Sequence, residues 1–178
     1  MSKLNVEHHL DCKLIRFSLI SDSRGFFYES FNEEISKITG FWPKQENVSK
    51  SVKGVIRGLH MQHSPPAAKL IRVVSGKIRD VAVDFRRSSS SYGKYVYVDL
   101  DDSFPHWFLI PEGHLHGFSV LSEHAVVNYL VSAPYVPGGE ISVNPFSRSL
   151  GIDWKITREE SLQSEKDKNA IDFEEINL

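Results

Sequence analysis

KLIRVVSGKIRDVAVDF, from Lys69 to Phe85, is the stretch whose pattern decides the fold class. Two runs rich in β-branched residues flank the pair Ser75-Gly76, and this arrangement predicts two strands joined by a hairpin turn. In the second run valines alternate with aspartates, which is the period of two expected of a strand with two different faces. The stretch therefore predicts antiparallel β structure.

Further strand signals lie on the C-terminal side of this stretch. KYVYVDL (94–100) repeats the alternation, and AVVNYLVSA (125–133) is another predicted strand. HWFLIPEG (106–113) and GFSVLS (117–122) are predicted to pair around a Pro/Gly turn. Turn signals recur about every dozen residues, which favours a sandwich or barrel over alternating βαβ units.

Two short segments have helical signals instead. SFNEEISKITG (30–40) offers Asn32 as an N-cap and Gly40 as a stop, with Ile35 and Ile38 on one face. We therefore expect a short peripheral helix there.

The second helical segment is TREESLQSEKD (157–167). Thr157 and Glu160 have the spacing of a capping box, so we expect the helix to begin there. The chain is thus predicted to be a mainly β protein with short peripheral helices.

Length and charge narrow the class of protein. A chain of 178 residues can bury a core without disulfides or metals, and its length favours one domain spanning 1–178. The net charge of −2 gives the protein no overall positive potential that would attract nucleic acid. Cys12 is the only cysteine, which indicates a reducing compartment. Neither a signal peptide nor an apolar run of about 18 residues is evident, so we expect a cytoplasmic protein that contacts no membrane.

The histidines are unevenly placed, since six of the eight lie between His60 and His124. His114 and His116, two residues apart on a predicted strand, could share a face and chelate a metal ion. A third protein ligand is not evident, and a single histidine is more often structural than functional.

The string PEGHLHG has the spacing Pro-x-Gly-x-x-His, which resembles the second motif of the cupin superfamily, whose fold is a jelly-roll β-sandwich or barrel. A metal-dependent cupin, such as a dioxygenase or isomerase, therefore stays open as an alternative.

A longer set of strings resembles one family within the cupins, the dTDP-4-dehydrorhamnose 3,5-epimerases. In chain order these strings are SDSRGFFYESF, QENVS, RGLHMQ, KLIRVVSGKIRDVAVDFRRSS, GKYVYVDL, LIPEGHLHGFSVLSE and LGIDW. The resemblance covers almost the full length. It implies a cupin jelly roll and a nucleoside-diphosphate 4-keto-6-deoxyhexose as substrate. The ketone acidifies the C–H bonds at C3 and C5, so inversion needs a base, an acid on the opposite face and a group that stabilises an oxyanion. No metal or redox cofactor is implied.

The resemblance assigns catalytic roles to four residues. His60 is the base, Asp167 is the carboxylate that orients it, Lys69 stabilises the oxyanion and Tyr129 is the acid. From the sequence alone each has a plainer interpretation: Asp167 as a solvated tail residue, Lys69 as a strand-end lysine and Tyr129 as part of the core.

The resemblance also assigns substrate contacts. Arg24 and Arg57 are expected to bind the diphosphate, because arginine forks match phosphate oxygens. The remaining residues are expected around the sugar and the base, and these are Glu29, Gln45, Asn47, His116, Tyr135 and Glu140.

Several positions depart from the family pattern. Met61 stands where the family usually has tyrosine, PPAAKL lacks the usual glutamine and glycine, and Pro134 replaces a tyrosine. VNPFSRS stands where the family has a Trp-Asn-Asp-Pro string. These changes leave the four catalytic positions intact, so the nucleotide base, the sugar and the number of inverted carbons stay open.

Two further expectations concern partners and alternatives. The resemblance implies a homodimer with exchanged N-terminal strands, in which Arg24 and Glu29 enter the partner's site. A sugar-binding cupin without catalysis is the second alternative, because a fold does not determine a function.

Overall fold

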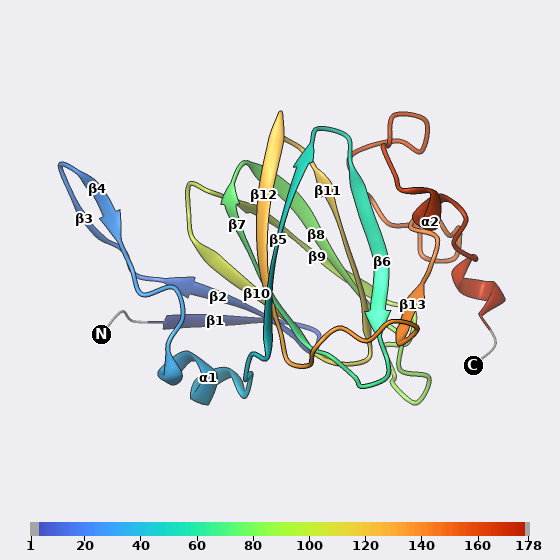
Figure 1. The fold of residues 1–178 in the computed structure, drawn as a ribbon, viewed down its shortest axis with the longest axis horizontal. Helices are drawn as coiled ribbons and strands as arrows, with labels where there is room; N and C mark the ends of the chain where they lie inside the picture. Colours follow the sequence, from blue (N-terminus) through green and yellow to red (C-terminus); the bar gives the residue numbers. More distant parts are fainter. Residues whose placement is uncertain (1–3, 177–178) are drawn as a thin grey trace.

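The computed structural model describes residues 4–176, which form two antiparallel sheets packed face to face and a small projecting hairpin (Figure 1). The first sheet has the order β1 (Leu4–His9), β2 (Cys12–Phe17), β10 (His106–Ile110), β7 (Lys69–Ser75), β12 (His124–Val131) and β5 (Gln45–Val52). The second has the order β13 (Glu140–Ser142), β6 (Ile56–Gln62), β11 (His114–Val120), β8 (Lys77–Asp84) and β9 (Tyr95–Asp101). This is the mainly β jelly-roll sandwich that the sequence predicted.

The hairpin predicted at Ser75-Gly76 is wrong. β7 lies in the six-stranded sheet and β8 in the five-stranded sheet, so the chain passes from one sheet to the other at Gly76. Gly76 has φ +84°, and a Cβ there would lie 2.0 Å from the carbonyl oxygen of His124. Only glycine fits this crossing. A local turn signal does not reveal which neighbour each strand will pair with.

The pairing predicted between 106–113 and 117–122 is wrong for the same reason. β10 pairs with β2 and β7, whereas β11 pairs with β6 and β8 in the opposite sheet. From β5 to β8 and again from β9 to β13, consecutive strands alternate between the two sheets, whereas β1 pairs with β2 and β8 with β9 within one sheet.

Helix α1 (Glu33–Thr39) has the predicted caps. The Oδ1 of Asn32 accepts a hydrogen bond from the N–H of Ile35 at 3.0 Å, and Gly40 ends the helix at φ 74°. Ile35 is buried, but Ile38 is 48% exposed, so the predicted apolar face does not pack as a unit. The buried side of this helix is formed by Ile35, Ser36 and Thr39, which leaves Ile38 on the side that faces solvent.

The helix predicted over 157–167 is wrong in its extent. Thr157 and Glu160 do form the hydrogen bonds of a capping box, but only a turn follows them. The next residues pair with the backbone of the loop before β6, because Leu162 donates to Gly54 O at 2.8 Å and accepts from Ile56 N–H at 3.0 Å. Helix α2 (Glu165–Lys168) starts only after this extended contact, and a 3₁₀ turn (Phe173–Glu175) follows near the end.

Three apolar clusters hold the sheets and their covers together. One lies between the sheets, and a second packs Phe41 against the outer face of the six-stranded sheet, where Trp107 of β10 is buried. The third packs Trp154 and Phe173 of the C-terminal segment against the outer face of β8 and β6. Figure 1 shows this segment, in orange to red, passing beside β6 and β13. This packing brings residues 161–168 to the rim of the space between the sheets.

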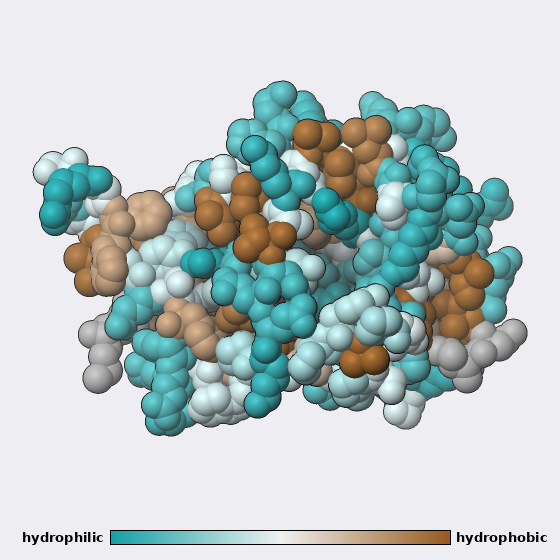
Figure 2. Space-filling view, viewed as in Figure 1, coloured by the Kyte–Doolittle hydropathy of each residue, from teal (hydrophilic) through white to brown (hydrophobic). Residues whose placement is uncertain are grey.

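The hairpin of β3 (Ile20–Asp22) and β4 (Gly25–Phe27) projects from the body of the molecule (Figure 1). Ile20, Phe26 and Phe27 are exposed there, and Figure 2 shows apolar surface at this end of the molecule. No helix within residues 4–176 is long and apolar enough to cross a membrane.

Candidate active site

A cavity of about 750 Å³ opens between the two sheets. Its walls come from β5, β7 and β12 on one side and from β6, β11 and β13 on the other, and residues 161–168 line part of its rim. Most of the predicted site residues line it, and these are Gln45, Asn47, Arg57, His60, Lys69, His116, Tyr129, Tyr135, Glu140 and Asp167.

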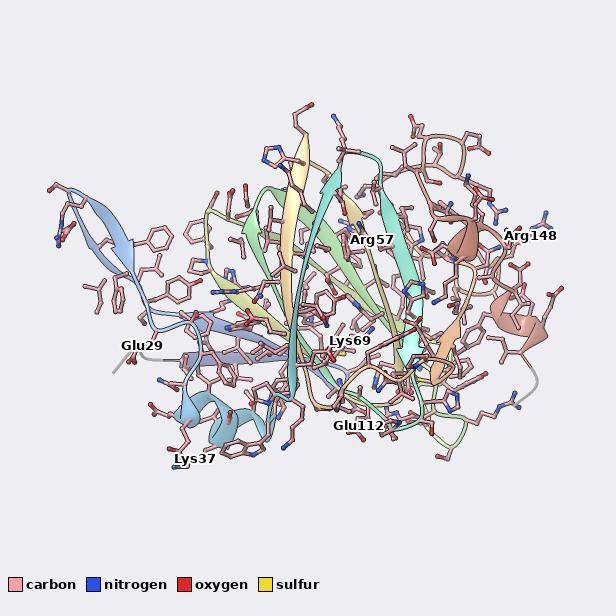
Figure 3. All side chains as sticks on the ribbon, viewed as in Figure 1. Glu29, Lys37, Arg57, Lys69, Glu112 and Arg148 are labelled. Atoms are coloured by element: carbon pink, nitrogen blue, oxygen red, sulfur yellow. The ribbon has the colours of Figure 1, made fainter. Side chains whose placement is uncertain are left out.

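Strand alternation explains why these side chains meet. On β12, Tyr129 and Val131 line the cavity, whereas Leu130 packs in the cluster on the outer face. On β7, Lys69 lines the cavity and Leu70 packs outward in the same way. Figure 3 shows Arg57 and Lys69 in the region of the cavity.

His60 and Asp167 form the most direct contact of the site. The Nε2 of His60 lies 2.6 Å from Oδ1 of Asp167, which is 107 residues away in sequence and buried. Burial alone would raise the pKa of Asp167, but hydrogen bonds from His60, Ser164 and the N–H of Gly58 hold it below its usual value. The carboxylate is therefore ionised at neutral pH and orients the ring.

The other ring nitrogen of His60 remains available to a ligand. Its Nδ1 lies 3.8 Å from Oε1 of Glu140, beyond hydrogen-bond distance. Glu140 is in turn ion-paired with Lys166. The imidazole thus lies between two carboxylates, Asp167 at Nε2 and Glu140 on the side of Nδ1.

Lys69 supplies a cation from the opposite sheet. Its Nζ donates to the carbonyl oxygen of His60 at 3.1 Å. Burial lowers the pKa of Lys69 to about 8, although the charges of Glu140 and Asp80 oppose that shift. An ammonium held in this position can stabilise an oxyanion that forms in the cavity.

Tyr129 faces the cavity from β12, in the sheet opposite His60. Burial raises the pKa of its phenol, while the Arg57 cation opposes the shift. The phenol is therefore protonated at neutral pH and can donate a proton. A base and an acid from opposite walls of one cavity can act on the two faces of one bound ring.

The remaining polar residues surround these groups. Arg57 donates from Nε to Ser51 Oγ at 2.9 Å, and Gln45 donates from Nε2 to Asn47 Oδ1 at 2.8 Å. Tyr135 lies at the rim and is 56% exposed.

His116 lies deeper and pairs with a residue that the sequence analysis did not single out. Its Nε2 is 3.1 Å from Oδ2 of Asp80, which is fully buried. Burial lowers the pKa of His116, and Asp80 opposes the shift. A signal for Asp80 existed, because a charged residue alternates there with valines in a strand.

Arg24 and Glu29 do not reach the cavity of their own chain. Arg24 lies on the projecting hairpin, where its side chain is 88% exposed and ion-paired with Asp22. Glu29 lines a separate small hollow beside α1, and Figure 3 shows it at the N-terminal side of the molecule.

The described residues contain one grouping with metal-ligand spacing, and it lies outside the cavity lining. Asp11, Asp84 and His114 have ligand atoms within 4.8 Å of one another. The guanidinium of Arg86 pairs with Asp11 at 2.5 Å and with Asp84 at 2.8 Å, so a cation already balances both carboxylates. His114 belongs to this grouping, whereas His116 bonds to Asp80.

Comparison with known proteins connects this geometry to a family. The family model described as dTDP-4-dehydrorhamnose 3,5-epimerase matches residues 8–175. The chain is 42% identical over 159 residues to the dTDP-4-dehydrorhamnose 3,5-epimerase of Methanothermobacter thermautotrophicus, covering 88% of this chain and 86% of that relative.

Solved structures agree. The dTDP-6-deoxy-D-glucose-3,5-epimerase of Legionella pneumophila, in complex with dTDP-4-keto-L-rhamnose, matches with a TM-score of 0.92 at 36% identity, covering 98% of this chain and 95% of that one. The dTDP-4-dehydrorhamnose 3,5-epimerase of Elizabethkingia anophelis matches with a TM-score of 0.90 at 40% identity, covering 99% of each chain. This chain belongs to the dTDP-4-dehydrorhamnose 3,5-epimerase family.

Proposed function

We propose that this chain is an isomerase that inverts C3 and C5 of a nucleoside-diphosphate 4-keto-6-deoxyhexose, converting dTDP-4-dehydro-6-deoxyglucose to dTDP-4-dehydrorhamnose. The observation that carries the proposal is the cavity in which the His60–Asp167 pair of one wall faces Lys69 and Tyr129 of the other. The complex of the Legionella pneumophila relative with dTDP-4-keto-L-rhamnose supports the substrate class.

The reaction begins with loss of a proton from the carbon beside the ketone. His60 accepts it on Nδ1, because Nε2 is held by Asp167. The C–H bonding pair moves into the ring as a C=C bond, and the carbonyl electrons move onto O4. The Asp167 carboxylate stabilises the imidazolium, and the Lys69 ammonium stabilises the enolate oxygen.

Tyr129 completes the inversion from the opposite face. Its phenol donates a proton to the carbon as the C=O bond re-forms, and the phenolate then recovers a proton from water while His60 releases its own. One proton leaves and one returns at each centre, so the step is redox-neutral. Repetition at the second carbon gives the 3,5-epimer.

Substrate binding draws on the rest of the cavity and on a second chain. Arg57 binds the diphosphate, and the polar residues Gln45, Asn47, His116, Tyr135 and Glu140 surround the sugar and the base. In a homodimer the β3–β4 hairpin, with its exposed apolar residues, brings Arg24 and Glu29 to the partner's cavity. The single cysteine, which is buried, fits a cytoplasmic location.

The test is incubation with a panel of nucleotide-linked 4-keto sugars in heavy water, followed by mass spectrometry. Two deuterons entering the dTDP sugar would support the 3,5-reaction, and one deuteron would restrict the enzyme to a single carbon. A panel in which no sugar gains deuterium would overturn the proposal.

A second prediction concerns metals. Because the ketone itself accepts the electron pair, we expect turnover to be unchanged after dialysis against a chelator. The measurement is the rate of epimerisation before and after dialysis. Loss of activity that a divalent ion restores would favour the metal-dependent alternative.

A third prediction concerns pH. The Lys69 ammonium is required, and its pKa of about 8 means that the charge is present below that pH and lost above it. We therefore expect kcat/KM, which reports the free enzyme, to fall as the pH rises through about 8. Lys69→Arg, which stays charged, should lower the rate but remove this fall. A wild-type profile that stays flat up to about pH 9.5 would contradict the assignment.

A further inference from the structure

The loop of residues 132–139, called the rim loop below, joins the two walls of the cavity. It leaves β12, which carries Tyr129, and leads into β13, which begins at Glu140 near His60. Residues 134–138 are exposed, and Tyr135 of this loop lines the cavity at its rim. Since the rim loop is irregular, something other than strand pairing must hold Tyr135 in place.

Gln62, at the end of the strand that carries His60, supplies one such anchor. Its Nε2 donates to the carbonyl oxygens of Pro134 at 3.0 Å and Pro65 at 3.1 Å. Its Oε1 accepts from the N–H of Val136 at 3.2 Å. Both ends of one amide are therefore bonded to the backbone on either side of Tyr135.

Because Gln62 is buried, loss of these hydrogen bonds would cost free energy. Gln62 is only 7% exposed, so its amide has little access to water that could replace a lost partner. Pro134 and Val136, in contrast, are exposed, and within residues 4–176, besides the bonds to Gln62, the carbonyl of Val136 accepts only a bond from inside the loop, from the N–H of Gly139 at 3.0 Å. The loop gains order from Gln62.

A second anchor ties the rim loop to the other sheet. Gln45 of β5 accepts from the N–H of Tyr135 at 2.9 Å. Gln62 thus holds the residues before and after Tyr135 to the five-stranded sheet, while Gln45 holds Tyr135 itself to the six-stranded sheet. The two glutamines set the position of the Tyr135 ring relative to the cavity.

We infer that Gln62 is a positioning residue, which fixes the rim loop and through it the contact of Tyr135 with the nucleotide sugar. The expected change in KM rests on the proposed function, whereas the expected loss of order in the rim loop does not. Gln62 donates nothing to the reacting carbons, and His60 and Tyr129 remain on their strands without it.

The first variant is Gln62→Leu, which keeps the approximate volume and removes all three hydrogen bonds. We expect KM for the nucleotide sugar to rise about tenfold and kcat to change less than about threefold. Ser119→Ala is the matched control, because it also removes a buried hydrogen bond, 2.7 Å to the Trp154 carbonyl, but lies outside the cavity. Its KM should equal that of the wild type.

A double-mutant cycle separates positioning from a general structural effect. If Gln62 acts through Tyr135, Gln62→Leu should raise KM by less than about twofold in a Tyr135→Ala background. A full tenfold effect in that background would overturn the inference.

Hydrogen exchange provides a readout that needs no activity. Amides of the rim loop should exchange at least about fivefold faster in Gln62→Leu than in the wild type or in Ser119→Ala. Unchanged protection would overturn the inference whether or not the chain epimerises any sugar. Faster exchange in an enzyme without turnover would uphold the positioning role and count against the proposed function alone.

Discussion

His60→Ala is expected to reduce incorporation of solvent deuterium at C3 and C5 by at least about 10³-fold, because the imidazole that takes the proton is removed. The Nδ1 of His60 is the ring nitrogen not bonded to Asp167, and removal of the ring leaves the carboxylate of Asp167 with no imidazole to orient. Mass spectrometry measures the rate at which deuterium enters the 4-keto sugar.

His63→Ala is the matched control for this experiment. His63 follows three residues later but is exposed and does not line the cavity. Its variant should incorporate deuterium at the wild-type rate. Normal exchange in His60→Ala would show that His60 is not the base.

Tyr129→Phe is expected to separate exchange from inversion. His60 can still remove a proton and return a deuteron to the same face, so exchange should change only a few-fold. Inversion should fall about 10²-fold, because the proton donor on the opposite face is lost. The measurement compares deuterium entry with formation of the epimer in the same sample.

Tyr97→Phe is the matched control, because the Tyr97 side chain is exposed on β9 and lies outside the cavity. This variant should keep the wild-type ratio of inversion to exchange. If Tyr129→Phe slowed exchange and inversion equally, Tyr129 would not be the acid on the opposite face.

Local features of the sequence were sufficient to predict some of the structure. The alternation in residues 77–84 predicted a strand, and Asn32 and Gly40 predicted the ends of α1. These predictions succeed because capping hydrogen bonds and strand alternation involve residues only a few positions apart in the chain. The same alternation would have singled out Asp80, a charge on the inward face of an apolar strand.

Other features failed because they depend on partners far away in sequence. Ser75-Gly76 has the composition of a hairpin, but β10 and β12 occupy both edges of β7, and β8 lies in the other sheet. The helix expected from Thr157 does not form beyond one turn, because Leu162 pairs with the backbone around Gly54. Burial and pairing across the whole molecule outweighed the local preference in both places.

In the candidate site, too, some features follow from local sequence and others depend on residues far away in the chain. Within one strand, the order of the residues is enough to predict which side chains share a face, so Tyr129 and Val131, or His60 and Gln62, are expected to point the same way. The packing of the folded chain brings Asp167 to His60 across 107 residues, because the C-terminal segment covers the outer face of β8 and β6. It also places Arg24 and Glu29 away from their own cavity. The physical reason is that the period of a strand is set by its own backbone, whereas the neighbour it packs against is chosen by the burial of apolar surface contributed by the entire chain.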